Sequence, residues 1–138
     1  MIHSFSCKNF YSFGELGSLD FVVNENAPQN NGYFKTGSGV RLSKVETVIG
    51  PNASGKTNLL KVLPFLKWII VDSFNSKPDD PVIVQPFAFG DAKKEPIELS
   101  AAFEMDGKIY TYSFTTVQER ILSEKLERTT FVKEKKGT

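Results

Sequence analysis

The chain has 138 residues, 40% of them hydrophobic, 12 phenylalanines and a formal net charge of +1. This length and composition are typical of one globular domain or part of a larger one, and they exclude a disordered chain. The small net charge gives no electrostatic argument for binding to nucleic acid or to an anionic membrane. Cys7 is the only cysteine, which excludes an internal disulfide framework and suits a reducing compartment.

The sequence gives no sign of export or of membrane insertion. Its N-terminal segment, MIHSFSCKNF, lacks an apolar core behind a basic head, so it does not look like a signal peptide. The most apolar stretch, residues 63–71, contains Lys67 and is too short to span a bilayer. We therefore expect a cytoplasmic protein that has no membrane partner.

The first 24 residues predict a β-hairpin. Residues 2–13 alternate in polarity as a strand does, residues 14–17 contain two glycines that favour a turn, and residues 18–24 predict a second short strand. Residues 24–39 are rich in Asn, Gly and Ser, which is typical of a solvated loop.

Residues 50–57, with the sequence GPNASGKT, match the phosphate-loop pattern G-x-x-x-x-G-K-[ST], also called Walker A, at every fixed position. In such a loop the small residues let the backbone curl, so that N–H groups converge on phosphate oxygens where a helix begins. Lys56 would contact the outer phosphates, and the Thr57 hydroxyl would bind Mg²⁺. Pro51 has no N–H to contribute. The predicted binding residues are therefore Asn52, Ala53, Ser54, Gly55, Lys56 and Thr57, and Thr57 is the predicted metal ligand.

A phosphate loop needs a strand before it and a helix after it, and residues 45–71 predict both. Val45, Val48 and Ile49 form a short β-branched run that is typical of a buried strand. Residues 55–71 carry leucines and other apolar residues at helical spacing, which predicts a helix. Pro64 lies inside this helix and predicts a kink or a short break there.

Residues 96–131 predict an antiparallel β arm. Asp106 and Gly107 are the preferred residues of a two-residue type I′ turn, because both tolerate positive φ. Folding the chain there pairs Phe103 with Tyr110 and Leu99 with Phe114 on one apolar face, while Glu104 falls on the mostly polar face. Residues 117–131 fit either a helix or a strand, and we favour a third antiparallel strand.

Phosphate loops occur in kinases, GTPases, AAA-type machines and ABC-type ATPases. In small-molecule kinases and GTPases the loop usually follows the first strand, whereas 49 residues precede Gly50 here. This position, together with the stretches SFSCKNFYSFGEL, GPNASGKTNLLKVL and PIELSAAFEMDGKIYTYSF, resembles the bacterial ABC-like ATP-binding proteins. That group includes chromosome-maintenance ATPases, the recombination protein RecF and overcoming-lysogenisation-defect-type defence proteins.

The resemblance implies an α/β P-loop NTPase fold. Residues 1–138 would form the N-terminal lobe of an ABC-like ATPase head, with an antiparallel β arm. Two positions depart from the family pattern. Ala53 stands where these proteins often have Gly, a change that is tolerated if the local φ is negative. Tyr11 stands where they often have Arg or Lys near the nucleotide, and its ring would either pack on the core or stack on the base.

The resemblance also implies parts that this sequence lacks. Complete heads form a homodimer that sandwiches ATP, in which a Ser-Gly-rich signature and an Asp–Glu pair (Walker B) complete the site. Nothing after Thr57 supplies these motifs, so no residue is assigned as catalytic and the chain is interpreted as a fragment. The family's water-positioning glutamine would be sought at Gln85 or Gln118.

Two functions remain open. The first is ATP binding as part of an ABC-like ATPase head in DNA maintenance or phage defence. Hydrolysis would then require a C-terminal portion and a second head, and DNA or an effector nuclease would bind through the missing regions. The second is a nucleotide-sensing or structural module that does not hydrolyse ATP.

Overall fold

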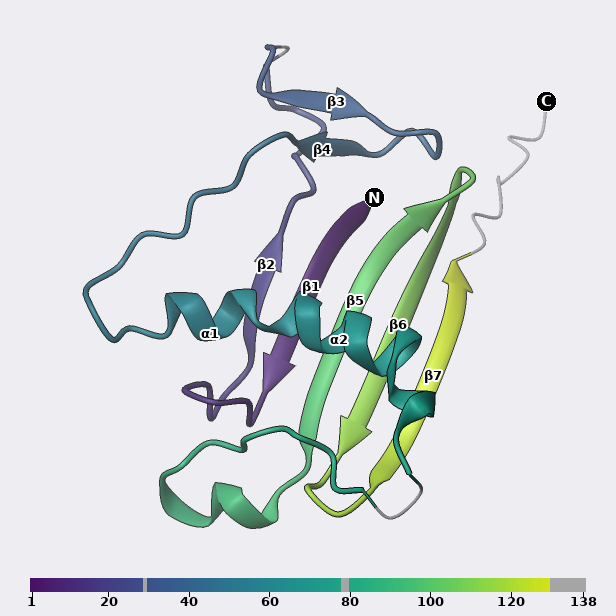
Figure 1. The fold of residues 1–138 in the computed structure, drawn as a ribbon. Helices are drawn as coiled ribbons and strands as arrows, with labels where there is room; N and C mark the ends of the chain where they lie inside the picture. Colours follow the sequence, from purple (N-terminus) through teal and green to yellow (C-terminus); the bar gives the residue numbers. More distant parts are fainter. Residues whose placement is uncertain (29, 78–79, 130–138) are drawn as a thin grey trace, which may run out of the picture.

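The computed structural model describes residues 1–28, 30–77 and 80–129. Its main feature is a five-stranded antiparallel sheet with the strand order β2-β1-β5-β6-β7 (Figure 1). The strands are β1 (Ile2–Lys8), β2 (Gly17–Asp20), β5 (Ile97–Met105), β6 (Lys108–Thr116) and β7 (Ile121–Thr129). The architecture is thus a mixed α/β fold built on an antiparallel sheet.

The turn between β5 and β6 sets the register of the sheet. Asp106 and Gly107 have φ values of 52° and 71°, as a type I′ turn requires. Phe103 lies opposite Tyr110 and Leu99 opposite Phe114, so the predicted register is confirmed. β7 pairs antiparallel with β6, which confirms the third strand of the arm, although residues 130 and 131 lie outside the described residues.

The N-terminal hairpin is shorter than the sequence pattern suggested. β1 pairs with both β2 and β5, but it ends at Lys8, whereas the predicted strand continued to residue 13. Asn9 and Tyr11 have φ values of 52° and 51°, which turn the chain out of the strand. The alternation of polar and apolar residues continues through this turn and therefore concealed it.

A two-stranded hairpin of β3 (Tyr33–Lys35) and β4 (Arg41–Ser43) lies beyond one end of the main sheet (Figure 1). β3 corrects the prediction that residues 24–39 form only a solvated loop. Arg41 orders this region, because its Nη1 donates to the carbonyl oxygen of Ala27 and to the Tyr33 hydroxyl, both at 3.2 Å. The Asn-rich composition of residues 24–39 could not predict this order, because the arginine that provides it lies outside that stretch.

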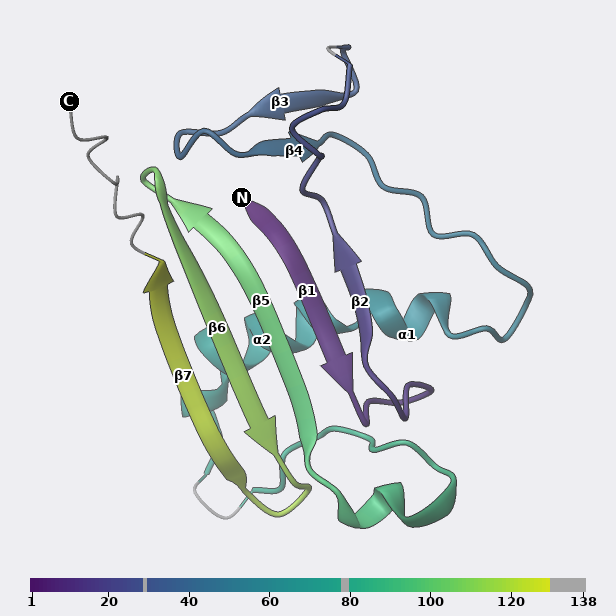
Figure 2. The ribbon, with the colours of Figure 1, turned by 180° about the vertical axis from the view of Figure 1, so that it is seen from behind.

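Two consecutive helices, α1 (Lys56–Leu60) and α2 (Val62–Val71), lie over one face of the sheet, and the view from behind shows the other face uncovered (Figures 1 and 2). The helix breaks at Lys61, one turn before Pro64, which cannot donate a hydrogen bond back to that turn. Two short 3₁₀ helices, Ser73–Asn75 and Gly90–Lys94, complete the elements. No helix among the described residues is long and apolar enough to cross a membrane.

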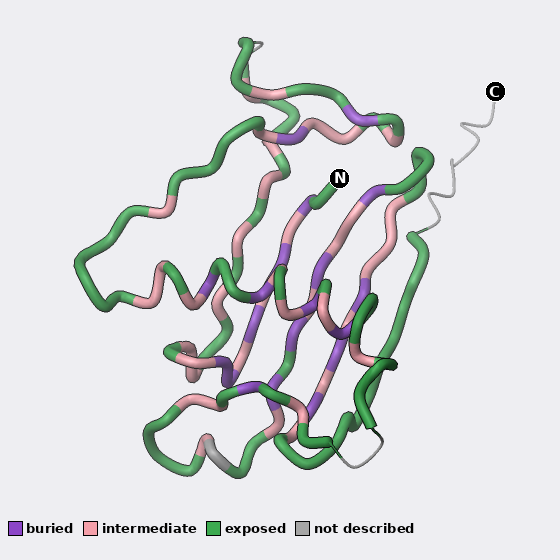
Figure 3. The backbone as a smooth tube through the Cα atoms, viewed as in Figure 1, coloured by how far each residue is buried: buried purple, intermediate pink, exposed green. Residues whose placement is uncertain are grey.

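The core lies between these helices and the sheet. Buried positions follow β1, β5 and β6, whereas β7 is exposed along its length (Figure 3). The helices bury apolar residues that recur every three or four positions, so that one side of each helix faces the core, as in amphipathic helices. The main buried side chains are Phe5, Phe10, Leu59, Val62, Leu66, Ile69, Ile97, Leu99 and Phe114.

The predicted strand before the phosphate loop is absent, which corrects the assignment of residues 45–49. Val45 and Ile49 are 75% and 88% exposed, and this segment has no strand conformation. A strand needs a hydrogen-bonding neighbour, and no segment in the described part of the chain pairs with it. The β-branched residues at positions 45–49 favour a strand, but the strand forms only if a second strand lies beside it.

Candidate functional site

The predicted phosphate loop, residues 50–57, is a curled and largely exposed segment that leads into α1. Ala53 and Gly55 both have left-handed φ values, of 63° and 91°. The Ser54 N–H donates to the carbonyl oxygen of Pro51 at 3.3 Å, and helical bonding begins where Leu59 N donates to the Gly55 carbonyl oxygen at 3.0 Å. The condition for tolerating alanine at position 53, a negative φ, is therefore not met. A left-handed alanine costs roughly 1–2 kcal/mol relative to ordinary helical backbone.

Lys56 folds its side chain over the loop. Its ammonium nitrogen, Nζ, donates to the carbonyl oxygens of Gly50 and Pro51 at 2.8 and 2.6 Å, and it lies 3.4 Å from the Ser54 hydroxyl. An ammonium group has three donors and no acceptor, so any incoming anion would exchange for these carbonyl oxygens. Thr57 follows in the first turn of α1, where its side chain is exposed. The loop thus brings together the predicted lysine and hydroxyl on accessible surface.

A second turn, residues 9–13, supports the loop from the sheet side. Asn58 Nδ2 donates to the Ser12 hydroxyl at 3.0 Å. A Cβ atom added to Gly55 would lie 2.6 Å from Ser12 Oγ, closer than real Cβ contacts come, and 3.4 Å from the Phe13 ring. Gly55 is therefore required both by its positive φ and by the close approach of this turn. Ser12 and Asn58 are not among the site residues that the sequence pattern predicted.

Asn9 anchors the supporting turn. Its side chain is fully buried, and Nδ2 donates to the carbonyl oxygens of Ala92 and Glu95 at 2.7 and 2.8 Å. Its Oδ1 accepts from the Phe87 N–H at 2.9 Å. A buried amide with all of these partners fixes the segment rigidly, since losing any one of them would leave a polar group unsatisfied. The sequence signal that could have identified it is an asparagine, a residue that tolerates positive φ, inside a run that otherwise alternates as a strand does.

Tyr11 packs within the same turn. Its ring contacts Phe10 edge-on at 4.7 Å between centroids, and the Lys61 ammonium lies 4.2 Å from the ring centroid. The structure therefore places a cation beside Tyr11, contributed by the junction of α1 and α2. A contact of this kind is a cation–π interaction, and it engages one face of the ring.

The two glutamine candidates lie in different surroundings. The Gln85 carbonyl oxygen accepts from the Tyr11 N–H at 2.8 Å, so Gln85 lies beside the turn that supports the loop. Gln118 lies in the connection between β6 and β7, and its Nε2 is 3.5 Å from the Val84 carbonyl oxygen. Both side chains are exposed. The backbone bond to Tyr11 links Gln85, but not Gln118, to the supporting turn.

Acidic groups do not gather near the loop in the part of the chain that the structure describes. No group of three or more His, Cys, Asp or Glu residues there could hold a metal ion. Asp72 caps the C-terminal end of α2, and the Asp80 carboxylate accepts from the Lys77 N–H at 2.8 Å. Asp79 lies outside the described residues. Thr57 therefore remains the only predicted metal ligand among the described residues.

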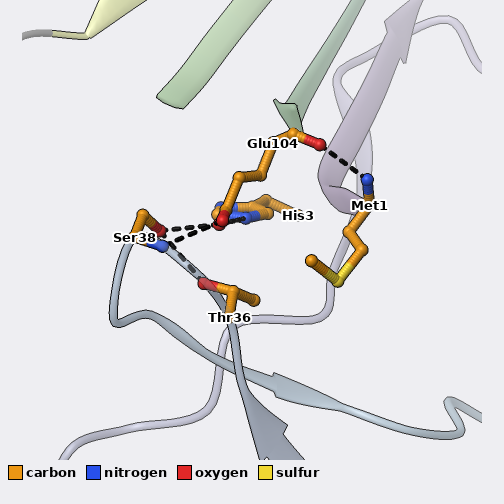
Figure 4. Close-up of polar contacts among 5 residues, drawn as sticks. All are labelled: Met1, His3, Thr36, Ser38 and Glu104. Atoms are coloured by element: carbon orange, nitrogen blue, oxygen red, sulfur yellow. Dashed lines mark hydrogen bonds and ion pairs between the residues drawn. The ribbon is translucent and has the colours of Figure 1, made fainter. Parts of the chain in front are cut away.

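A polar cluster around the buried side chain of Glu104 joins the small hairpin to the sheet (Figure 4). Glu104 accepts from the Ser38 hydroxyl at 2.6 Å and the Ser38 N–H at 2.9 Å, and His3 Nε2 lies 3.2 Å from its Oε2. The hydroxyls of Thr36 and Ser38 are 3.0 Å apart, and the Met1 ammonium donates to the Glu104 carbonyl oxygen at 2.7 Å. We call these five residues the Glu104 clasp.

The hydrogen bonds of the clasp favour the ionised form of the Glu104 carboxylate. Burial acts to raise the pKa of Glu104, but hydrogen bonds from Ser38, Thr36 and His3 together lower it from 4.5 to about 2. The sequence pattern placed Glu104 on a polar face, and the structure shows that the β3–β4 hairpin buries it there. Cys7 differs, because burial raises the pKa of its thiol to about 11, which leaves it uncharged and unreactive.

One protein family matches the chain. A family model described as AAA domain, putative AbiEii toxin, Type IV TA system, matches residues 47–137, about two thirds of the sequence. The matched region begins three residues before the phosphate loop and includes the helices and the β5–β7 arm. No curated protein matches the chain.

Proposed function

Because the chain belongs to the AAA-domain family described as putative AbiEii toxin, Type IV TA system, we propose that residues 50–57 bind Mg·ATP as part of a cytoplasmic ABC-like ATPase head. The family supports a nucleotide-binding, ATPase-like function in general, and AAA-type ATPases use ATP and Mg²⁺. The observation that carries the proposal is the phosphate loop itself. It lies within the matched region, curls through two left-handed residues, and holds the Lys56 ammonium against oxygen atoms.

The residues of the loop fit a triphosphate and its metal ion. The backbone N–H groups of residues 52–57 would donate to phosphate oxygens, and Lys56 would leave the Gly50 and Pro51 carbonyls to contact the outer phosphates. The Thr57 hydroxyl would bind Mg²⁺, which neutralises charge on the phosphates when bound. Ser12 and Asn58 would keep the loop in place from outside it.

We propose that hydrolysis requires a C-terminal portion and a second head. The exposed β-branched segment at residues 45–49 supports this, because such a run is suited to a sheet that further strands would complete. Complete heads would form a homodimer, and DNA or an effector nuclease would bind elsewhere, in DNA maintenance or phage defence. Gln85 is the better candidate for positioning water, since Tyr11 links it to the loop's supporting turn.

Calorimetry of Mg·ATP binding tests the loop directly. Lys56→Ala should weaken binding at least tenfold, because it removes a charge-assisted hydrogen bond worth about 1.5–3 kcal/mol. Lys67→Ala, at an exposed position on α2, is the matched control and should bind as the wild type does. Both variants should melt at the wild-type temperature. Equal affinity of Lys56→Ala and the wild type would exclude the proposed site.

The alternative function is a nucleotide-sensing or structural module. It is favoured by the lack of an acidic cluster in residues 1–28, 30–77 and 80–129. Phosphate release separates the two functions. A protein that carries the complementing portion should release phosphate, and Lys56→Ala should abolish this release. Tight Mg·ATP binding without phosphate release, even in that protein, would favour the sensing module.

A further inference from the structure

Strand β7 (Ile121–Thr129) forms an open edge of the main sheet. It lies at one side of the sheet in both views (Figures 1 and 2), and all nine of its residues are exposed. One edge of β7 pairs with β6, and within the described residues no strand pairs with the other. An edge of this length presents a row of backbone donors and acceptors that another strand can pair with.

The two faces of β7 carry different side chains. Glu124, Leu126 and Arg128 lie opposite Phe114, Tyr112 and Tyr110, on the face that α2 covers. Lys125 and Glu127 lie opposite Ser113 and Thr111 on the other face, where Lys125 Nζ is 2.8 Å from Glu127 Oε1. Positive and negative charges therefore occur on both faces, on either side of Leu126. Leu126 itself is 61% exposed.

We propose that β7 pairs antiparallel with β7 of a second copy of this chain, about a two-fold axis at Leu126. In this register Glu124 lies opposite the partner's Arg128, and Lys125 lies opposite the partner's Glu127. The two-fold axis repeats both contacts, which gives four pairs of opposite charge. Leu126 lies opposite the partner's Leu126, which covers an exposed leucine on the apolar face. Ser123 lies opposite the partner's Thr129.

The charges select this register over its neighbours. Directly opposed residues of an antiparallel pair share a face, so registers that keep the two apolar faces together must be centred on a residue. Centring the axis on Lys125 would oppose two lysines, and centring it on Glu124 or Glu127 would oppose two glutamates. Like charges directly opposite destabilise a sheet. Only the register centred on Leu126 opposes unlike charges throughout residues 124–128.

Charged residues on an edge strand often prevent association, and the sign pattern of β7 argues against that role here. An edge protected by charge repels a second copy only if like charges meet. In β7 the signs compensate each other about Leu126. Glu124 can contact Tyr112 of its own chain and the partner's Arg128 at the same time. Its Oε1 accepts from the Tyr112 hydroxyl at 2.7 Å, while the second oxygen of the carboxylate can accept from the arginine.

The resulting dimer would extend the five-stranded sheet continuously across the two-fold axis, with α2 of both copies on the same face. The proposal uses no residue of the phosphate loop, so it goes beyond the nucleotide-binding function and stands or fails separately. Strand pairing joins chains through backbone hydrogen bonds, and the side chains determine the register and the choice of partner.

Sedimentation of the full 138-residue chain over a range of concentrations tests the proposal. The wild type should form a dimer. Lys125→Glu and Glu127→Lys should each weaken the dimer by about tenfold or more, because each turns two attractive pairs into repulsive ones. The control is Lys44→Glu, which makes the same change of charge at an exposed position outside β7 and should dimerise as the wild type does.

Mixing the two single variants is the decisive step. In the mixed dimer each glutamate of one variant lies opposite a lysine of the other, so the mixture should dimerise more tightly than either variant does alone. The double variant Lys125→Glu/Glu127→Lys should also dimerise. A monomeric wild type would overturn the proposal, and so would single variants that dimerise normally or a mixture that stays monomeric. A monomer whose β7 amides resist hydrogen exchange would show that the edge is covered within the chain.

Discussion

At the scale of single residues, the conformation of the predicted phosphate loop depends on Gly55. Its φ of 91° is unfavourable for other residues, and the Ser12 hydroxyl leaves no room for a Cβ atom. Gly55→Ala should therefore destabilise the chain by about 1–3 kcal/mol, measured by denaturant unfolding. Ser12→Ala in the same chain should recover part of this loss, because it removes the nearest atom. Additive effects of the two changes would contradict the close contact.

At the scale of elements, the Glu104 clasp holds the β3–β4 hairpin against the sheet. Glu104→Gln should reduce the free energy of unfolding at pH 7 by about 1.5–3 kcal/mol, since it removes the charge from a set of part-buried hydrogen bonds. Denaturant unfolding measures this loss. The control Glu98→Gln changes an exposed glutamate of the same strand and should have little effect.

The pH dependence of the clasp follows from the pKa of Glu104. Because this pKa falls from 4.5 to about 2 on folding, the carboxylate stabilises the folded chain fully above about pH 4.5. The stabilisation is lost as the pH falls from 4.5 through 2. Wild-type unfolding curves should show this loss, and Glu104→Gln should show less of it. The same acid sensitivity in both proteins would mean that other groups cause it.

The β5–β6 hairpin provides a second prediction for an element. Phe114 is 1% exposed in the core, whereas Phe103 is only partly buried and stacks on Tyr110 at 5.7 Å between ring centroids. Phe114→Ala should therefore cost about 3–5 kcal/mol of stability, and Phe103→Ala clearly less. Thermal or denaturant unfolding of the two variants gives the comparison. A larger loss for Phe103→Ala would contradict the observed packing.

At the scale of the whole molecule, the segment that leads into the phosphate loop lies apart from the core. Ile49→Ser should change the free energy of unfolding by less than about 0.5 kcal/mol, because Ile49 is 88% exposed. The amides of residues 45–49 should also exchange rapidly with solvent, since no strand protects them. A marked loss of stability in Ile49→Ser would mean that this segment is packed in solution.

Local rules predicted those parts of the structure that local interactions determine. The Asp106-Gly107 turn set the register of β5 and β6, because residues on both sides of a two-residue turn have only one way to pair. The glycine-rich pattern of residues 50–57 likewise predicted a curled segment leading into a helix, and the structure has left-handed residues there directly before α1. Turn residues and spacing were sufficient here because few other conformations satisfy them.

The sequence by itself therefore determined the antiparallel arm and the helical segment after residues 50–57, while the role of those residues in phosphate binding stays a prediction. Tertiary structure alone decided that Glu104 is buried, that Asn9 anchors a turn and that residues 45–49 lie exposed. Each of these depends on partners far away in the chain: Ser38 for Glu104, Ala92 and Glu95 for Asn9, and a neighbouring strand for residues 45–49. Polarity and periodicity describe what a segment favours, but the burial of a polar group or the pairing of a strand is decided by what packs against it.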